Sequence, residues 1–271
     1  MKVLITGGNG FLAKNISKKL IDSNINVTSI TRKNDFDLRN TFETSKFFEN
    51  KYFDVVLHCA ISGGRRLKED SIDILDDNLR MALNLIKNRN HYSKLINFGS
   101  GAELDRSNSI YQETNVHDAV PEDYYGFSKN VISRLFLNEI DAVNLRIFNV
   151  FSAFESEGRM ISTSIRNYIN NKPITIHQDR YMDFIYFDDF FEILKHVLDK
   201  QTDLKEIDCV YNEKYKLTDI ASVINKLSDY KTEVILENAK IGNSYCGISK
   251  LQNLNFIGLE KSIRKIHSIL L

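Results

Sequence analysis

The sequence contains no tryptophan, only two prolines and only three cysteines among its 271 residues. The cysteines, Cys59, Cys209 and Cys246, are odd in number, widely spaced and without a C-x-x-C pair, which argues against a disulfide framework and against a zinc site. We therefore expect no bound metal and a reducing, cytoplasmic location. Because no Gly/Ser-rich stretch marks a flexible linker, any lobes must be closely joined.

The sequence also lacks net charge and long apolar runs. Its 36 basic residues balance its 36 acidic ones, so no overall field favours nucleic acid or an anionic membrane as a partner. No apolar run approaches the roughly 20 residues that span a bilayer, and no signal-like segment opens the chain, so we expect neither membrane insertion nor secretion. What is present, 42% hydrophobic residues, suffices for one large domain or two lobes.

A short apolar strand runs directly into a glycine turn at residues 2–10. Gly7 and Gly10 allow a tight turn and close backbone approach, and a helix beginning at Phe11 and Leu12 would direct its first N–H groups at a phosphate. We interpret these four residues as a dinucleotide-binding turn, in which Ala13 replaces the third glycine of the usual pattern. The alternative is a strand-to-helix turn that binds nothing.

Strand-like and helix-compatible segments then alternate. This alternation predicts an α/β fold with a doubly wound parallel (Rossmann) sheet, whose ligands bind beyond the carboxyl ends of the strands. We assign residues 1–152 to this domain and 153–271 to a smaller C-terminal substrate lobe, of which roughly 183–212 packs back on the first domain. The predicted strands are Val3–Thr6, Val27–Thr31, Val55–His58, Leu95–Phe98, Asn144–Phe148 and, in the lobe, Asp183–Phe187. The predicted helices of the lobe are Ile161–Asn171, which a polar loop follows, Phe190–Asp199, Leu217–Leu227 and Leu259–Leu270.

The end of the second predicted strand, Thr31-Arg32-Lys33, indicates which dinucleotide binds. An acidic residue there would accept a ribose 2′-hydroxyl, whereas the Arg32 guanidinium suits a 2′-phosphate. NADP is therefore favoured over NAD, unless Arg32 and Lys33 are merely solvated loop charges. Asp37, followed by Leu38, is placed to accept the adenine amino group. After the third strand, Cys59 and the small Ala60 would lie beneath the cofactor, while His58 is interpreted as a core histidine.

Ser100, Tyr125 and Lys129 are the catalytic candidates. Tyr125 and Lys129 lie one helical turn apart, where an ammonium can favour the phenolate form of tyrosine. Tyr168 and Lys172 share this spacing, but Lys172 precedes Pro173, a helix boundary, and no strand-end serine lies suitably upstream. Ser100 does follow a predicted strand, so we predict that it converges with Tyr125 on one substrate oxygen.

Seven blocks in order resemble the extended short-chain dehydrogenases/reductases, the nucleotide-sugar epimerase, dehydratase and reductase family. The resemblance implies catalysis by Ser100, Tyr125 and Lys129, a path to the nicotinamide that begins at Phe148, and contact of Asn149 with a sugar diphosphate. Gly63, Gly64 and Gly101 are further expected substrate contacts. The matching blocks begin at Thr6, His58, Gly99, Tyr125, Leu145, Asp183 and Ile248.

Departures from the family pattern narrow the expected reaction. Family dehydratases have Asp-Glu after the catalytic serine, whereas Ser100 is followed by Gly101-Ala102, and Glu103 lies one position too far, which turns its side chain to the opposite face. Dehydration is therefore not expected. Ala102 also replaces the cysteine that assists epimerisation in GDP-fucose synthase. Met182 replaces a family arginine that clamps the diphosphate; the candidates to compensate are Arg180, Arg159 and Arg65, each otherwise a surface charge.

The sequence thus predicts an NADPH-dependent reductase of a 4-keto group on a nucleotide-activated deoxysugar. Two alternatives remain: a nucleotide-sugar C4 epimerase that retains its NAD(P), and a non-catalytic NADP-binding regulatory relative. By analogy with the family, a homodimer is expected.

Overall fold

The computed structural model describes residues 1–64, 69–109, 115–139, 141–155, 158–199 and 202–271. The chain divides into two compact units. The first comprises Met1–Asp105, Thr114–Arg146 and Thr202–Ile207, and the second Arg106–Glu113, Ile147–Gln201 and Asp208–Leu271. The change of unit after Arg146 precedes the predicted boundary at residue 152, and of the segment 183–212 only residues 202–207 join the first unit. The last two of residues 202–207 belong to β9 (Glu206–Cys209), which pairs with β5 (Ala142–Ile147) at the edge of the sheet of the first unit.

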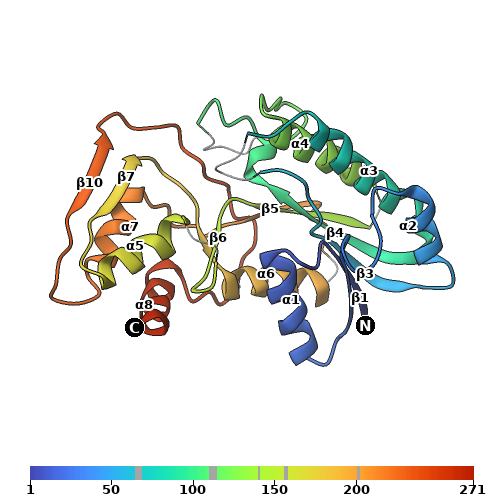
Figure 1. The fold of residues 1–271 in the computed structure, drawn as a ribbon, viewed down its shortest axis with the longest axis horizontal. Helices are drawn as coiled ribbons and strands as arrows, with labels where there is room; N and C mark the ends of the chain where they lie inside the picture. The colour runs from blue at the N-terminus through green and yellow to red at the C-terminus, as the bar shows by residue number, and fades with distance from the viewer. Residues whose placement is uncertain (65–68, 110–114, 140, 156–157, 200–201) are drawn as a thin grey trace. The chain divides into compact units, whose positions relative to one another are not determined.

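The described part of the first unit is built on a six-stranded sheet in the order β2-β1-β3-β4-β5-β9. The pairs β1–β2, β1–β3 and β3–β4 are parallel, and α2, α3 and α4 lie on one face with α1 on the other (Figure 1). The predicted α/β fold with a doubly wound parallel sheet is confirmed. Its elements are β1 (Lys2–Thr6), α1 (Phe11–Asp22), β2 (Asn26–Ile30), α2 (Thr41–Phe48), β3 (Phe53–His58), α3 (Asp73–Lys87), β4 (Tyr92–Ser100), α4 (Tyr124–Leu137), β5 (Ala142–Ile147) and β9 (Glu206–Cys209).

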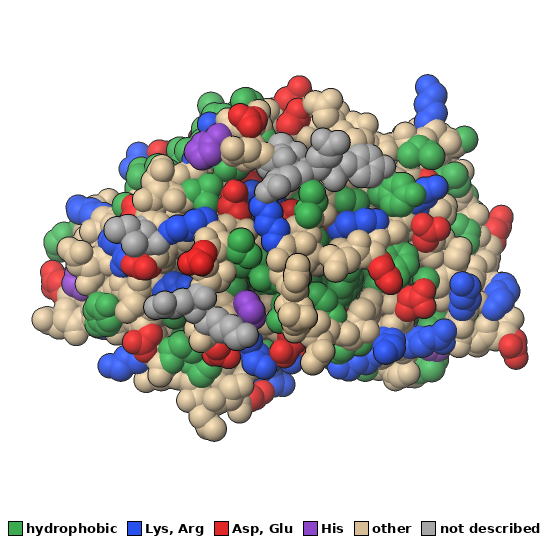
Figure 2. Space-filling view, turned by 180° about the vertical axis from the view of Figure 1, so that it is seen from behind, with side chains coloured by type: hydrophobic (Ala, Val, Ile, Leu, Met, Phe, Trp, Pro, Cys, Tyr) green, Lys and Arg blue, Asp and Glu red, His purple; other side chains and the backbone are tan. Residues whose placement is uncertain are grey.

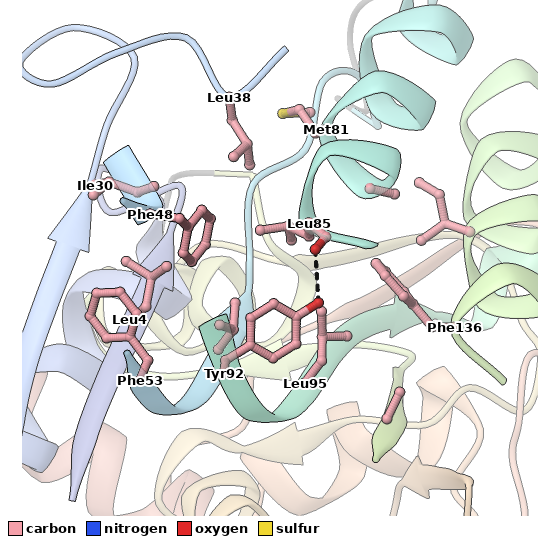
Figure 3. Packing of buried hydrophobic residues seen from close by; sticks show 14 residues of the cluster. Leu4, Ile30, Leu38, Phe48, Phe53, Met81, Leu85, Tyr92, Leu95 and Phe136 are labelled. Atoms are coloured by element: carbon pink, nitrogen blue, oxygen red, sulfur yellow. Dashed lines mark hydrogen bonds between the residues drawn. The ribbon is translucent and has the colours of Figure 1, made fainter. Parts of the chain in front are cut away.

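Burial explains why these segments fold as they do. In β1, Val3, Leu4 and Ile5 are all fully buried, as expected for a central strand covered on both faces. A cluster of buried hydrophobic residues fills the space between the sheet and α2, α3 and α4, and the Tyr92 hydroxyl donates to the Leu85 carbonyl at 2.9 Å (Figure 3). This cluster supports the strand ends at which ligands of such sheets bind.

The second unit carries the predicted helices and a small sheet that the sequence did not reveal. β7 (Ile174–Gln178) lies where we expected a polar loop, and it pairs in parallel with β10 (Val234–Asn238). Strand β8 (Ile185–Tyr186) is shorter than the predicted strand Asp183–Phe187. The remaining elements are β6 (Val150–Phe151), α5 (Met160–Ile169), β8 (Ile185–Tyr186), α6 (Phe187–Asp199), α7 (Leu217–Ile224) and α8 (Leu259–Leu270).

The surface agrees with the balanced charge count. Basic and acidic side chains are interspersed over the face shown in Figure 2. Among the described residues, no helix combines the length and apolar character needed to cross a membrane, and no group of three His, Cys, Asp or Glu side chains has the arrangement of metal ligands.

Candidate active site

A cleft of about 760 Å³ opens at the carboxyl ends of β1, β2 and β3. Because β2 and β3 pair with opposite edges of β1, this is the topological switch point at which doubly wound sheets bind ligands. The cleft brings together nine of the twelve predicted cofactor residues and one of the predicted substrate residues. These are Gly7, Gly10, Thr31, Arg32, Lys33, Asp37, Leu38, Cys59 and Ala60 from the cofactor set, with Gly63 from the substrate set.

The glycine turn at the base of the cleft has the geometry that close backbone approach requires. Gly7 has φ +68°, and a Cβ there would lie 2.7 Å from the Ala60 Cα, so only glycine fits. Gly10 is the N-cap of α1, and no side chain caps this helix end, which carries the partial positive charge that attracts an anion. Phe11 and Leu12 form the half-buried first turn of α1. This turn therefore fits a dinucleotide pyrophosphate.

The loop after β2 carries an acidic group that the sequence analysis missed. The Asp35 carboxylate accepts from the backbone N–H of Thr31 at 2.7 Å and from its hydroxyl at 3.3 Å. Arg32 and Lys33 are exposed side chains of the same turn and line the cleft. The cations of Arg32 and Lys33 thus line the cleft after β2, and the Asp35 carboxylate is hydrogen-bonded to the neighbouring Thr31.

The Asp37 carboxylate is held by a neighbouring arginine. Arg39 donates from Nε to Oδ1 of Asp37 at 2.9 Å and from a terminal nitrogen to Oδ2 at 2.5 Å, and it also donates to Asp77 of α3 at 2.6 Å. The hydrogen bonds from Arg39 lower the pKa of Asp37 below its ordinary value. An adenine amino group could therefore donate only to a carboxylate that Arg39 already binds. The adenine-binding role of Asp37 remains a prediction.

His58 is a core histidine, as interpreted from the sequence. It is buried, its Nδ1 lies 3.0 Å from the Thr6 hydroxyl oxygen, and that oxygen accepts from the Ala60 N–H at 3.1 Å. Burial, with a contribution from the Lys129 charge, lowers the pKa of His58 to about 3. The neutral imidazole therefore helps to fix the start of the cleft-lining loop 59–64.

The same loop is tied to the proposed catalytic helix by a buried asparagine. Asn78 of α3 accepts from the Ser62 N–H at 2.7 Å, and its Nδ2 donates to the Ser62 carbonyl and to the Ser128 hydroxyl of α4, each at 3.0 Å. At the end of the loop, a Cβ on Gly64 would lie 2.6 Å from Cε2 of Tyr125. The Tyr125 ring therefore packs directly on the backbone that borders the cleft.

Helix α4 begins where its capping residue dictates, and it carries two of the catalytic candidates. The Asp123 carboxylate accepts from the Gly126 N–H at 2.8 Å, which caps the helix just before Tyr125. Lys129 is buried, and its Nζ donates to the Phe98 carbonyl at 2.5 Å. Burial lowers the pKa of Lys129 to about 8, while the Glu103 charge acts in the opposite direction. The ammonium thus lies under the end of β4.

Ser100 is the last residue of β4 and is almost fully buried. Its Oγ accepts from the Ala102 N–H at 3.2 Å, so its own hydrogen is left to donate to an oxygen outside this turn. Gly101 lies in the buried 3-10 turn that follows. Lys129 binds the carbonyl two residues before Ser100, which brings these two candidates to the same end of β4.

The remaining predicted substrate residues lie in the second unit, apart from Arg65, which falls outside the described residues. Phe148 stacks edge-on against Tyr245 at 4.9 Å between ring centroids, and Asn149 Nδ2 donates to the Asp183 carbonyl at 2.9 Å. Arg159 is exposed at the start of α5, and Arg180 donates to Gln178 at 3.1 Å. The role of Phe148 near the nicotinamide and the substrate roles of Asn149, Arg159 and Arg180 remain predictions.

Tyr168, the tyrosine with the same spacing to a lysine, has a packing role. It is buried, and its hydroxyl contacts the Ser228 hydroxyl at 2.6 Å and donates to the Tyr230 carbonyl at 3.0 Å. Sequence reasoning also missed cleft-lining residues such as Phe36, Ile61, Ile74 and Met81. Apolar residues of this kind carry no motif, so their place in the cleft becomes visible only after folding.

The chain is similar to known proteins in sequence and in fold. The family model described as NAD dependent epimerase/dehydratase family matches residues 3–217. The chain belongs to this family. Protein CapI of Staphylococcus aureus is 23% identical over 235 residues, which are 74% of this chain and 70% of CapI.

Two solved structures of this kind share the fold. MlghC, the GDP-mannoheptose C4 reductase from Campylobacter jejuni with NADP bound, is similar with a TM-score of 0.80 and 17% identity, over 98% of this chain and 97% of that one. UDP-glucuronic acid 4-epimerase from Bacillus cereus, in complex with UDP-glucuronic acid and NAD, is similar with a TM-score of 0.76 and 20% identity, over 100% of both chains. At these identities the likeness establishes the fold alone.

Proposed function

We propose that this protein is an NADPH-dependent reductase of a 4-keto group on a nucleotide-activated deoxysugar. The observation that carries the proposal is the position of α4 beside the dinucleotide cleft. Tyr125 packs on Gly64 of the cleft-bordering loop, and Lys129 binds the end of the strand that Ser100 terminates. A phenol, an ammonium and a hydroxyl thereby lie on elements that border a site suited to a nicotinamide dinucleotide.

The residues of the cleft fit this cofactor. The Gly7 turn and the uncapped start of α1 would hold the pyrophosphate, and Arg32 with Lys33 would bind the 2′-phosphate. When bound, the cofactor supplies the hydride. Cys59 and Ala60 would support it from the end of β3, and the role expected of Phe148 near the nicotinamide belongs to the same proposal.

Each of the three catalytic residues then has a defined role. Tyr125 donates the proton to the substrate carbonyl oxygen as the hydride reaches C4, and Ser100 donates a hydrogen bond that orients and polarises this oxygen. Lys129, which is mostly protonated below its pKa of about 8, holds the cofactor ribose and favours the phenolate that Tyr125 becomes. Asn149 would contact the sugar diphosphate, and Gly64 and Gly101 would be further substrate contacts.

The test is a screen of nucleotide-4-keto-6-deoxysugars with NADPH oxidation as the readout. We expect Tyr125→Phe to lower kcat at least about a hundredfold with NADPH affinity nearly unchanged, because one hydroxyl supplies the proton. Tyr168→Phe is the matched control, since it removes the same group from a packed position in the second unit. Loss of activity in the control but not in Tyr125→Phe would show that the catalytic helix is assigned wrongly.

A C4 epimerase that retains its dinucleotide is the second candidate, and Asp35 favours it. This carboxylate reaches the residue at the end of β2, where an acidic group suits the 2′-hydroxyl of NAD. The two functions differ in stoichiometry. A reductase consumes one NADPH per product, whereas an epimerase interconverts two sugars without net oxidation of added cofactor.

We also propose a homodimer, with α3 and α4 as its interface. Leu83 of α3 and both Tyr124 and Phe127 of α4 are large apolar residues with at least a third of their surface exposed. Light scattering of the purified protein would test this. The cytoplasmic location expected from the sequence stays a prediction.

A further inference from the structure

Glu103, which the reaction proposed above does not use, is a fully buried carboxylate three residues after Ser100. Its Oε2 accepts from the Ser100 N–H at 3.2 Å. Its Oε1 accepts from Asn144 Nδ2 at 2.7 Å and from Arg146 Nε at 2.6 Å, both on β5. A charge is tolerated at this depth only where it is paired and hydrogen-bonded, and every one of these donors is itself buried.

The same residue connects the Ser100 turn to the helix of Tyr125 and Lys129. The Glu103 carbonyl accepts from Asn130 Nδ2 at 2.8 Å, and the Ser133 hydroxyl lies 3.5 Å from Oε1. Asn130 directly follows Lys129 on α4. Glu103 is thus a joint between the end of β4, which carries Ser100, and the helix that carries the other two catalytic candidates.

The charges around this joint are few among the described residues. Arg146, the partner of Glu103, also donates to the Glu206 carboxylate of β9, so one cation lies between two carboxylates. Lys129 interacts electrostatically with Glu103, with the Cys59 thiol and with His58. Its neighbour Tyr125 lies one turn earlier on α4. The Glu103 carboxylate, and to a smaller extent the Cys59 thiol, opposes the effect of burial on the pKa of the Lys129 ammonium.

We propose that Glu103 is a positioning residue, whose buried carboxylate holds the Ser100 turn against α4 and keeps Lys129 in its ammonium form. This inference rests on the proposed function only in that Ser100 and Lys129 serve catalysis. Apart from that, it concerns contacts within one compact unit. Removal of the charge should therefore change the titration of Lys129, which a purely structural role of Glu103 would not do.

The experiment compares Glu103→Gln with Glu206→Gln in the full chain. Both variants remove one carboxylate that pairs with Arg146, but only Glu103 contacts the Ser100 turn. Lys129 is titrated by NMR of side-chain-labelled lysine in the protein without added ligand, with its signal assigned by Lys129→Arg. We expect Glu103→Gln to lower the Lys129 midpoint by roughly one pH unit or more, because an opposite charge is lost nearby. Glu206→Gln should leave it in place.

Kinetics supply the second readout. The alkaline limb of the kcat/KM profile should move to lower pH with the Lys129 midpoint in Glu103→Gln and should stay in place in Glu206→Gln. An unchanged midpoint and limb in Glu103→Gln would overturn the inference, even if the variant were less stable. Failure of wild-type protein to reduce any 4-keto sugar would reject the proposed function alone, because the titration uses no substrate.

Should Glu103→Gln not fold, Glu103→Asp replaces it. Aspartate keeps the charge but is one methylene shorter, so it loses reach to the Ser100 N–H. We expect kcat to fall about tenfold or more while the Lys129 midpoint stays close to wild type, since misplacement of a catalytic group slows the reaction. Wild-type kcat in this variant would overturn the positioning role.

Discussion

Replacement of Gly7 by alanine tests whether the cofactor turn needs the close backbone approach that the structure shows. The φ of Gly7 is +68°, and a residue with a Cβ pays for this left-handed conformation with roughly 1–2 kcal/mol. The added Cβ would also lie 2.7 Å from Cα and 2.8 Å from N of Ala60, which are backbone atoms that cannot rotate away. Relief of such overpacking costs roughly 1–3 kcal/mol. Together the two effects predict a loss of roughly 2–5 kcal/mol in the free energy of unfolding.

The same change should weaken cofactor binding. Displacement of the turn removes a charge-assisted hydrogen bond to the pyrophosphate, worth roughly 1.5–3 kcal/mol, so we expect NADPH to bind about ten- to a hundredfold more weakly. Denaturant unfolding measures the first quantity, and calorimetric titration with NADPH measures the second.

Gly258→Ala is the matched control. Its φ is +83°, but a Cβ there meets no described atom within 4 Å, and it lies in the second unit. It should therefore show the conformational loss of roughly 1–2 kcal/mol alone, with NADPH affinity unchanged. Equal losses of stability in the two variants, together with wild-type NADPH affinity in Gly7→Ala, would refute the close approach at Gly7.

Two further predictions concern cofactor choice and pH. Arg32→Ala should weaken NADPH binding about ten- to a hundredfold and NADH binding much less, because Arg32 would contact the 2′-phosphate; equal losses in a titration of both cofactors, or a wild-type preference for NADH, would reject this role. Burial raises the pKa of Asp183 from 3.8 to about 6, against the opposing effect of Lys214. The contribution of the protonated Asp183 carboxyl to the free energy of unfolding is therefore fully present below pH 3.8 and is lost as the pH rises through about 6. Between pH 5 and 7.5, denaturant unfolding should show a fall in stability for wild type that is smaller in Asp183→Asn by roughly 1.4 kcal/mol, because about one pH unit of this window lies below the folded-state pKa; identical slopes would contradict it.

The sequence predicted those parts of the fold and site that depend on local chemistry. Helix α8 has the predicted bounds, Leu259–Leu270, because its buried Ile263 and Ile266 repeat at helical spacing. The turn at Gly7 was recognisable because a positive φ demands glycine wherever the chain later packs. Tyr125 and Lys129 share a face of α4 because their spacing equals one helical turn.

Tertiary structure decided what depends on distant residues. β7 escaped prediction because its partner, β10, lies some 60 residues later, and a short strand gains its stability from pairing. The sequence analysis placed Glu103 one position too far for dehydration chemistry but did not reveal its surroundings. A buried carboxylate is stable only among donors, and here these come from Asn144 and Arg146, about 40 residues further along the chain. No local pattern in the sequence predicts these contacts, because they form only once β4, β5 and α4 have packed together.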